Sequence, residues 1–235
     1  MGQSRARRAR TYDAAATRAA ILRAAETVFA DHGFEGARVD SIAAEAGYNK
    51  SLIFQYFGDK LSLYTQVLKQ IDEEANTLRA QVFAPLLANE HLATDAQQLR
   101  AFFEAAFQAV FTHLLEHPRF LRILLWEMAE GWLTYTRIQP QFQIEHVEQL
   151  ELLFQTAQQA GLIRSAFSPL IQLTMALQTC QCYLACLPLF QALLPNDNLA
   201  SAAALAEARQ HIVTVIVAGI LFDAPPPAEP KDLCQ

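Results

Sequence analysis

The segment 50–57, KSLIFQYF, brings cationic, amide, aliphatic and aromatic side chains together over about two helical turns. Lysine can donate to guanine O6 and N7, glutamine can pair with adenine, and leucine or phenylalanine can touch the thymine methyl group. A helix that exposes Leu, Phe and Tyr to water is unfavourable, whereas the major groove of DNA offers partners for these side chains. We therefore predict a DNA-facing surface formed by Lys50, Ser51, Leu52, Phe54, Gln55 and Tyr56.

The residues around this segment predict a helix-turn-helix. The preceding helix has an apolar stripe at the spacing i, i+3, i+4, i+7, formed by Val39, Ile42, Ala43 and Ala46. Gly47 suits a left-handed turn at the end of that helix, and Asn49 can cap the next one. Ile53 and Phe57 are four residues apart, so they can anchor the second helix to the first while its other faces stay available.

Two further helices are expected to hold this motif. A stripe formed by Ile21, Leu22, Ala25, Val28 and Phe29 predicts a helix upstream, with Asp13 as its N-cap and Gly33 at its end. Downstream, Asp59 caps a helix that reaches about Arg79. Lys60 lies in its first turn, where a cation opposes the helix dipole by roughly 0.3–1 kcal/mol. A nearby phosphate makes that charge favourable; a harmless exposed lysine is the alternative.

Charge is unevenly distributed along the 235 residues. The chain has a net charge of −6, yet residues 1–64 carry nine Lys or Arg and seven Asp or Glu, a net charge of +2. Without its first ten residues this part has a net charge of −2, so much of the positive charge belongs to a basic arm, residues 1–12. Such an arm is either a solvated, flexible tail or a contact to phosphates and the minor groove.

Helical patterns fill nearly the whole chain, which predicts an all-α fold. We expect an N-terminal three-helix bundle with the helix-turn-helix over residues 13–62, then a larger helical ligand-binding and dimerisation domain over 63–223. A Pro-rich, disordered tail is expected over 224–235. The helices expected in the larger domain, after the one from Asp59, are 94–117, 119–129, 140–161, 169–194 with a kink or break at Pro188, and 199–222.

The segment from Thr17 to Leu63 resembles the DNA-binding domain of the TetR (tetracycline-repressor) family. The resemblance covers about a fifth of the chain without gaps. It rests on Ile21-Leu22, Ala24-Ala25, Phe29-Ala30, Gly33-Phe34, Val39, Ile42-Ala43, Ala46-Gly47, Lys50, Tyr56-Phe57, Lys60 and Leu63. The rest of the chain is similar to the family only in layout, as a long all-helical domain after the DNA-reading part.

The resemblance implies a role for each matching position. The positions that fall where the family approaches base edges are Lys50, Ser51, Leu52, Phe54 and Gln55. Tyr56 and Lys60 fall where the family contacts phosphates. Arg38 stands where a Ser or Thr cap is common, so we expect that cap to be missing, at a cost of about 1 kcal/mol, and Arg38 itself to reach a phosphate. Leu52 and Phe54 each replace a residue with a hydroxyl, which leaves fewer polar contacts to bases.

The last two long helices are rich in Ala and Leu, and small residues allow helices to approach closely. The resemblance implies that they form a four-helix interface with a second copy of the chain. Because one short helix reads only a few base pairs, a dimer that reads two half-sites of a palindromic operator gains the remaining specificity.

The middle helices are expected to surround a small-molecule effector. Apolar walls with few polar anchors suit a hydrophobic or aromatic ligand. The candidate ligand contacts are Phe103, Phe107, Phe111, Trp126, Met128, Tyr135, Met175, Gln178 and Tyr183. An aromatic stripe at helical spacing also fits an ordinary core. A ligand that binds more tightly to the conformer in which the two DNA-reading helices are wrongly spaced weakens DNA binding. The helix from Asp59 is expected to connect the ligand site to the DNA-reading part. A ligand that strengthens DNA binding, a corepressor, is equally allowed.

Other chemistry is less favoured. His113 and His117 are four residues apart, but HLLEH is not HExxH, so helix-end histidines are the preferred interpretation. The cysteines of one later helix are interpreted as buried small hydrophobes rather than a redox sensor; they are Cys180, Cys182 and Cys186. The chain has no phosphate-binding Gly loop, nucleophile elbow or paired catalytic carboxylates, so we expect no enzyme, metal or cofactor.

The chain also carries no signal-peptide pattern, and its longest apolar stretch, 212–222, is about half of the ~20 residues that a membrane span needs. We therefore expect a cytoplasmic protein without a membrane partner. The preferred hypothesis is a dimeric, ligand-responsive repressor of transcription. The alternative is an all-helical small-molecule-binding or redox-sensing protein without operator binding.

Overall fold

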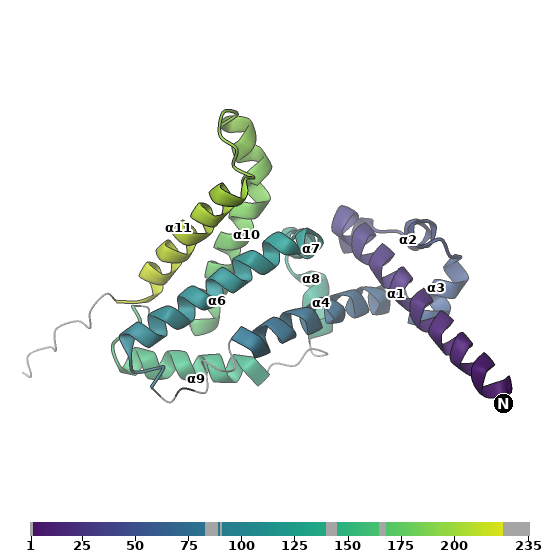
Figure 1. The fold of residues 1–235 in the computed structure, drawn as a ribbon, viewed down its shortest axis with the longest axis horizontal. Coiled ribbons are helices and arrows are strands. Elements are labelled where there is room, and N and C mark those ends of the chain that lie inside the picture. Colours follow the sequence, from purple (N-terminus) through teal and green to yellow (C-terminus); the bar gives the residue numbers. More distant parts are fainter. Residues whose placement is uncertain (1, 83–88, 90, 140–144, 165–167, 223–235) are drawn as a thin grey trace, which may run out of the picture. The chain divides into compact units, whose positions relative to one another are not determined.

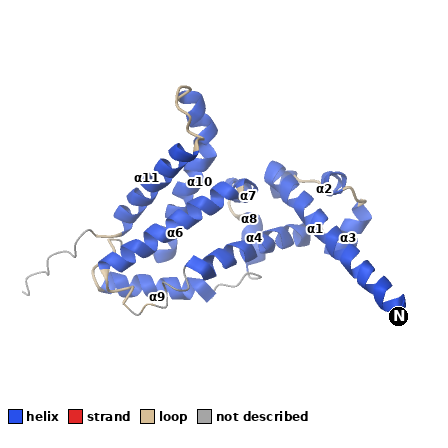
Figure 2. Cartoon of the chain, in the orientation of Figure 1, coloured by secondary structure: helices blue, strands red, loops and turns tan. Residues whose placement is uncertain are grey.

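The computed structural model describes residues 2–82, 89, 91–139, 145–164 and 168–222, and its named elements are all helices (Figures 1 and 2). The predicted all-α fold is confirmed. In chain order the helices are α1 (Gly2–Gly36), α2 (Val39–Ala46), α3 (Lys50–Phe57), α4 (Lys60–Val82), α6 (Ala96–Glu116), α7 (Pro118–Ala129), α8 (Leu133–Ile138), α9 (Glu145–Gln159), α10 (Pro169–Leu193) and α11 (Ala202–Ile220).

The chain forms two compact units. The first comprises Met1–Asn76 and His117–Phe142, and the second comprises Thr77–Glu116 and Gln143–Gln235. This division differs from the boundary expected at residue 62. The helices α7 and α8, which were assigned to the effector-binding domain, belong to the same unit as the helix-turn-helix.

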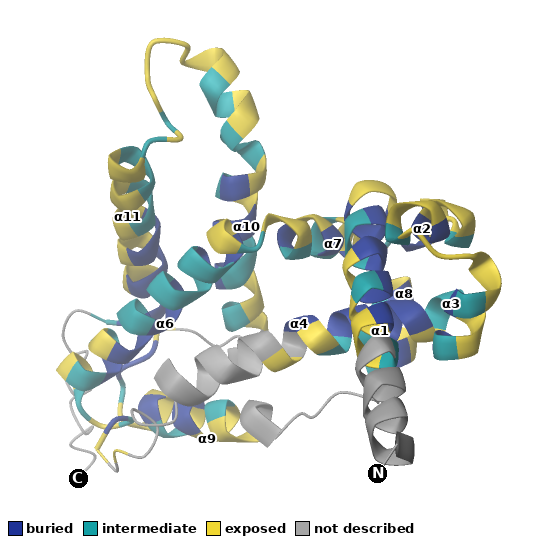
Figure 3. Ribbon diagram, turned by 45° about the vertical axis from the view of Figure 1, so that its right-hand side comes forward, coloured by how far each residue is buried: buried dark blue, intermediate teal, exposed yellow. Residues whose placement is uncertain are grey.

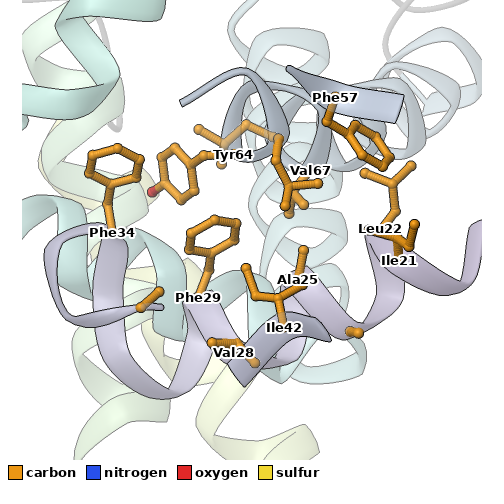
Figure 4. Packing of buried hydrophobic residues seen from close by; sticks show 14 of the residues in the cluster. Ile21, Leu22, Ala25, Val28, Phe29, Phe34, Ile42, Phe57, Tyr64 and Val67 are labelled. Carbon is orange, nitrogen blue, oxygen red and sulfur yellow. The ribbon is translucent and has the colours of Figure 1, made fainter. Parts of the chain in front are cut away.

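The core of the first unit forms on one face of α1. The stripe predicted from spacing is buried there and meets residues of α2, α3 and α4 (Figure 4). The ring of Phe29 meets Tyr64 of α4 edge-on, with ring centroids 4.8 Å apart, and Phe34 lies 5.1 Å from the same ring. Large aromatic side chains thus join the two helices that enclose the helix-turn-helix.

The predicted start of α1 is wrong, whereas its predicted end at Gly33 coincides with a break in the helical backbone. The helix begins at Gly2, so the basic residues 2–12 form its first turns and Asp13 is not its N-cap. Alanine and arginine favour helix, and no breaker separates them from the apolar stripe. Gly33 has a φ of 67° and a ψ of 178°, which are not helical, so the continuous helix ends there as predicted, and the residues up to Gly36 follow across a kink. A Cβ at Gly33 would lie 2.9 Å from Oε1 of Glu130 and 3.0 Å from Trp126, so this site requires glycine.

The second unit is built from α6, α9, α10 and α11. Its interior contains the rings of Phe103 and Phe154, which meet edge-on with centroids 5.3 Å apart. The chain after α9 is tied to the end of α11, because the Arg164 N–H donates to the Ile220 carbonyl at 2.9 Å and the Phe222 N–H donates to the Leu162 carbonyl at 3.0 Å.

Several boundaries of the larger domain differ from expectation. Helix α10 continues through Pro188, so a break there is wrong, and α11 begins at Ala202, after a Ser201 cap, rather than at residue 199. The short helix α8 was not predicted, and it follows Trp132, whose φ is 62°. The helix start expected at residue 140 and the tail over 224–235 lie outside the described residues.

Candidate nucleic-acid interface

The turn between α2 and α3 forms as its residues predict. Gly47 has a φ of 71° and a ψ of 23°, the left-handed conformation that ends α2. The side chain of Asn49 accepts a hydrogen bond from the Leu52 N–H at 2.8 Å, which caps α3. Arg38 is the N-cap of α2 and makes no side-chain cap hydrogen bond, so the predicted loss of that cap is confirmed.

The predicted inward face of α3 is confirmed. Ile53 and Phe57 are 2% and 7% exposed, respectively, and both belong to the core of the first unit. Lys50, Ser51, Phe54 and Gln55 are exposed, whereas Leu52 and Tyr56 are half-buried. Phe54, at 40%, is one of the exposed large hydrophobic side chains of the chain. An exposed phenylalanine beside a lysine and a glutamine fits a surface that meets a partner.

Lys50 has a partner on the neighbouring helix. Its Nζ lies 2.9 Å from Oδ2 of Asp40, and the two side chains are 46% and 70% exposed, respectively. Exposed ion pairs of this kind contribute little free energy because water and salt screen them. Lys50 can therefore leave Asp40 for a base edge or a phosphate at small cost.

Lys60 is held at the start of α4 by two contacts. Its Nζ donates to the Glu35 carbonyl at 3.3 Å and lies 4.6 Å from the centroid of the Phe34 ring. The carboxylate of Asp59 accepts a hydrogen bond from the Ser62 N–H at 2.6 Å and so caps the same helix, as predicted. The ammonium group is thus placed at the junction of α1 and α4 by its neighbours rather than free in solvent.

Arg18 is a structural residue of this surface that the sequence patterns did not single out. Its guanidinium donates to Oε1 of Gln66 at 2.6 Å and lies 5.2 Å from the centroid of the Phe57 ring. It therefore connects α1, α3 and α4. Its partners lie about 40 to 50 positions along the chain, so no local spacing marks it.

The candidate effector residues do not form one set. Phe103, Phe107 and Phe111 are buried on α6, with Phe103 stacked on Phe107 and Phe111 beside Tyr183. Gln178 is half-buried, and Met175 is 57% exposed on α10. The rings pack on one another, which also fits the alternative of an ordinary core.

The other three candidates belong to the first unit. The indole N–H of Trp126 donates to the Ala30 carbonyl of α1 at 3.1 Å, so this side chain connects α7 to α1 within the first unit. Tyr135 packs against the core of that unit, and Met128 is 42% exposed. Trp126 and Tyr135 thus contribute to packing within the first unit, and a ligand role for these three residues stays a prediction.

The cysteines of α10 differ from one another. Cys180 is buried, and burial raises the pKa of its thiol to about 11, as expected for an unreactive small hydrophobe. Cys182 is exposed, so its predicted burial is wrong, and Cys186 is intermediate. Within the described part of the chain, no three His, Cys, Asp or Glu side chains gather closely enough to hold a metal ion.

Exposed residues recur along α10 and α11 (Figure 3), and several of them are large and apolar. Large exposed side chains lie in two pairs along α10, each pair one turn apart and the two pairs about four turns apart: Ile171 with Met175, and Leu189 with Leu193. By length and composition alone, the segments Ile171–Leu193 and Ala202–Ile220 reach the threshold for a membrane span. Core helices of water-soluble proteins also reach it, so the criterion does not establish a membrane protein.

Two family models match this chain. The model for bacterial regulatory proteins of the tetR family matches residues 21–67, and the model for the tetracyclin repressor-like C-terminal domain matches residues 100–216. Together the two matches cover well over half of the chain. The chain belongs to the TetR family. TetR-family regulators are transcription factors and not enzymes, so the expectation that this protein is no enzyme is confirmed.

Individual relatives agree with the family. The HTH-type transcriptional repressor SCO4008 of Streptomyces coelicolor is 36% identical over 118 residues, which are 50% of this chain and 53% of the relative. The HTH-type transcriptional repressor NicS of Pseudomonas putida is 34% identical over 125 residues, 53% of this chain and 54% of the relative. The alignments therefore span about half the length of these relatives.

A solved structure extends the likeness over most of the chain. Protein SCO4942 of Streptomyces coelicolor is 26% identical, has a TM-score of 0.57, and covers 87% of this chain and 98% of its own. The likeness includes the helical region after the helix-turn-helix, for which the sequence offered only a resemblance in layout.

Proposed function

We propose that this TetR-family protein is a cytoplasmic repressor of transcription that binds a palindromic DNA operator as a homodimer and releases it when a hydrophobic or aromatic small molecule binds. The observation that carries the proposal is the outer face of α3, which exposes Lys50, Ser51, Phe54 and Gln55 while its inner face is buried. Contact between this phenylalanine ring and water is unfavourable in free energy, and a partner that covers the ring would remove that cost.

The proposed DNA contacts divide by chemistry. Side chains of α3 read base edges in the major groove, while cations around it bind phosphates and set the register. The proposed base contacts are Lys50, Ser51, Leu52, Phe54 and Gln55, and the proposed phosphate contacts are Arg38, Tyr56 and Lys60. Arg38 is exposed at the start of α2, so it can reach a phosphate without losing a cap hydrogen bond. The basic first turns of α1 are a further candidate contact.

The proposed dimer surface is formed by α10 and α11. Met175 and Leu189, both exposed on α10, are two heptads apart and so lie on one face of this helix, as in a helix that packs against another helix. Helix α11 adds Val215, which is 55% exposed, and the exposed small residues Ala218 and Gly219. Small residues let a second helix approach closely, and a two-fold axis buries the same face on both copies.

The effector contacts that we propose from the structure lie in the second unit. The buried phenylalanines of α6 and the adjoining Tyr183 offer aromatic surfaces to an apolar ligand. Such a ligand releases DNA if it binds more tightly to the conformer that cannot span both half-sites.

The proposal is tested by selection from a random duplex library with the purified wild-type protein. We expect recovery of an inverted repeat, with an affinity that falls steeply as salt rises. The variant Arg38→Gln should weaken binding and reduce the magnitude of the salt slope by about one for each lost phosphate contact. Arg119→Gln is the matched control, because Arg119 is an exposed arginine of α7 outside the proposed interface.

Two results decide against this function. If no duplex is enriched over the starting library, the protein is a small-molecule-binding or redox-sensing module without operator binding. If Arg119→Gln changes affinity and salt slope as much as Arg38→Gln, the cationic contacts are nonspecific and the proposed orientation of α2 on DNA is wrong.

A further inference from the structure

Glu127 of α7 is a buried carboxylate that the proposed DNA contacts do not use. Its side chain is 1% exposed. Oε1 accepts a hydrogen bond from the Tyr64 hydroxyl of α4 at 2.5 Å, and Oε2 accepts one from the Tyr135 N–H of α8 at 3.0 Å. A charged group taken out of water is costly unless such donors compensate it. Here each carboxylate oxygen has a donor, and the two donors come from different helices.

Tyr64 connects this carboxylate to the DNA-facing surface. It lies one turn after Lys60 on α4, and its ring packs between Phe29 and Phe34 of α1 (Figure 4). Burial raises the pKa of the Tyr64 hydroxyl far above its usual range, and the neighbouring Glu127 carboxylate raises that pKa further. The hydroxyl therefore stays protonated and remains a hydrogen-bond donor to Glu127.

The backbone turn after α7 directs two N–H groups to Glu127. Gly131 and Trp132 both have positive φ, 71° and 62°, respectively. A tryptophan rarely adopts this conformation, so its neighbours must compensate for the strain. The Trp132 N–H donates to the Glu127 carbonyl at 2.7 Å, and the turn brings the Tyr135 N–H back to the Glu127 carboxylate.

Helix α7 follows one of the three points at which the chain passes from one unit to the other. It begins at Pro118, two residues after α6 ends at Glu116, and α6 carries the buried phenylalanine stripe. Within the first unit, α7 is fixed to α1 by the Trp126 indole on the Ala30 carbonyl and by Arg122, whose guanidinium lies 3.0 Å from Asp31. Glu127 provides the corresponding link from α7 to α4.

We propose that Glu127 is a positioning residue for DNA binding: through the Tyr64 hydroxyl it sets α4 against α7 and α8, and thereby places Lys60 on the operator. This inference rests on the proposed function. Without the carboxylate, the Tyr135 N–H and the Tyr64 hydroxyl lose their buried acceptor, and α4 shifts to satisfy them elsewhere.

The test uses Tyr64→Phe and Glu127→Gln in the full chain, with the duplex that the wild-type protein selects from a random library. Binding is measured well below the thermal midpoint of each variant, so that all chains are folded. We expect each variant to bind at least about fivefold more weakly, within the usual range of coupling between sites. The salt slope should also fall in magnitude by about one for each displaced phosphate contact, which a purely structural loss would not change.

The matched control is Trp126→Phe, which removes a hydrogen bond from α7 to α1 and leaves the link to α4 intact. It should keep the wild-type affinity and salt slope once folded. The double variant Tyr64→Phe/Glu127→Gln should lose less affinity than the two single losses combined, because both substitutions act on the Tyr64–Glu127 hydrogen bond, while Glu127→Gln also leaves one oxygen fewer for the Tyr135 N–H. Should Glu127→Gln fail to fold, Tyr64→Phe carries the test, since it removes one hydroxyl from the same link.

The outcomes separate the two proposals. If the wild-type protein selects no duplex, the proposed function fails. If it selects one, and the folded Tyr64→Phe variant binds that duplex with unchanged affinity and salt slope, the positioning role of Glu127 is refuted while the repressor function stands. Equal losses from Trp126→Phe and Tyr64→Phe also overturn the inference, because they assign the effect to general packing of α7.

Discussion

At the residue scale, the outer face of α3 carries one side chain that is held by an ion pair and another that no such contact holds. Lys50 is engaged in an exposed ion pair with Asp40, whereas Gln55 is exposed without a hydrogen bond that fixes the packing of the helix. A substitution of Gln55 therefore leaves the fold intact, and any change that it causes in DNA binding reports on contact with DNA itself.

Gln55→Ala should change the preferred operator rather than abolish binding. A good bidentate contact to a base contributes about 1–3 kcal/mol of discrimination, so the variant should lose preference at one position in each half-site. Repeated selection from the random library measures this directly. Gln70→Ala, at an exposed glutamine of α4, is the control. An unchanged preference in Gln55→Ala removes this residue from base reading.

The cap at Asp59 should make the stability of the first unit depend on pH. The hydrogen bond from the Ser62 N–H lowers the pKa of the Asp59 carboxyl below its ordinary value of 3.8. Because the pKa of Asp59 is lower in the folded protein than in the unfolded chain, the ionised cap stabilises the fold fully at neutral pH. This stabilisation is lost as the pH falls below the unfolded-state pKa and through the folded-state pKa.

Asp59→Ala should cost about 1 kcal/mol in the free energy of unfolding at pH 7, the usual value of an N-cap. The cost should shrink at about pH 3, where the wild-type carboxyl begins to protonate. Urea denaturation at both pH values measures it. Asp59→Asn keeps a neutral cap, so its cost in the free energy of unfolding should be smaller than that of Asp59→Ala at both pH values. A cost for Asp59→Ala that is equal at pH 7 and pH 3 contradicts the account.

At the element scale, the last turn of α1 depends on one glycine. Gly33→Ala should destabilise the first unit by at least about 1 kcal/mol, because a left-handed φ is unfavourable for an L-residue and the new Cβ would press on Trp126 and Glu130. The added Cβ of Gly36→Ala lies 3.5 Å from the His32 Cβ, an ordinary contact, so this control should be neutral or stabilising by up to about 1 kcal/mol. Thermal unfolding of both variants decides, and equal effects would show that the turn tolerates a side chain.

Elements with local signals were predictable from the sequence, and elements that depend on distant contacts were not. Asn49 and Asp59 mark helix starts by capping, and both starts agree with the structure. Trp126 was assigned to an effector site from its aromatic character, but its partner Ala30 lies 96 residues away. No periodicity within α7 specifies that contact.

The same distinction explains the candidate site. The buried face of α3 follows from the spacing of Ile53 and Phe57, so its exposed positions could largely be predicted, although Leu52 and Tyr56 are half-buried. The buried link from Glu127 to Tyr64 joins residues 63 positions apart, and an acidic residue in an amphipathic helix ordinarily indicates the solvent face. Only the three-dimensional packing identifies this glutamate as buried.

At the scale of the whole molecule, the account requires two copies. Met175→Lys with Leu189→Lys should place two charges on the exposed apolar face of α10 and shift the protein to monomers. Operator affinity should then fall by at least about 10³-fold, toward the nonspecific level. Sedimentation velocity and DNA titration measure the two effects. Leu152→Lys, at a 65% exposed leucine of α9, is the control. A double variant that remains dimeric and binds DNA as the wild type does excludes α10 as the interface.

The central claim is that the two α3 helices of one dimer read two inverted half-sites on one face of the duplex. The most direct measurement is a titration of the selected duplex after base pairs are inserted between its half-sites. Five added base pairs rotate one half-site by about half a turn, so affinity should fall at least about 100-fold, with partial recovery at ten. Equal affinity at every spacing, or equally tight binding of one dimer to a single half-site, would contradict the account.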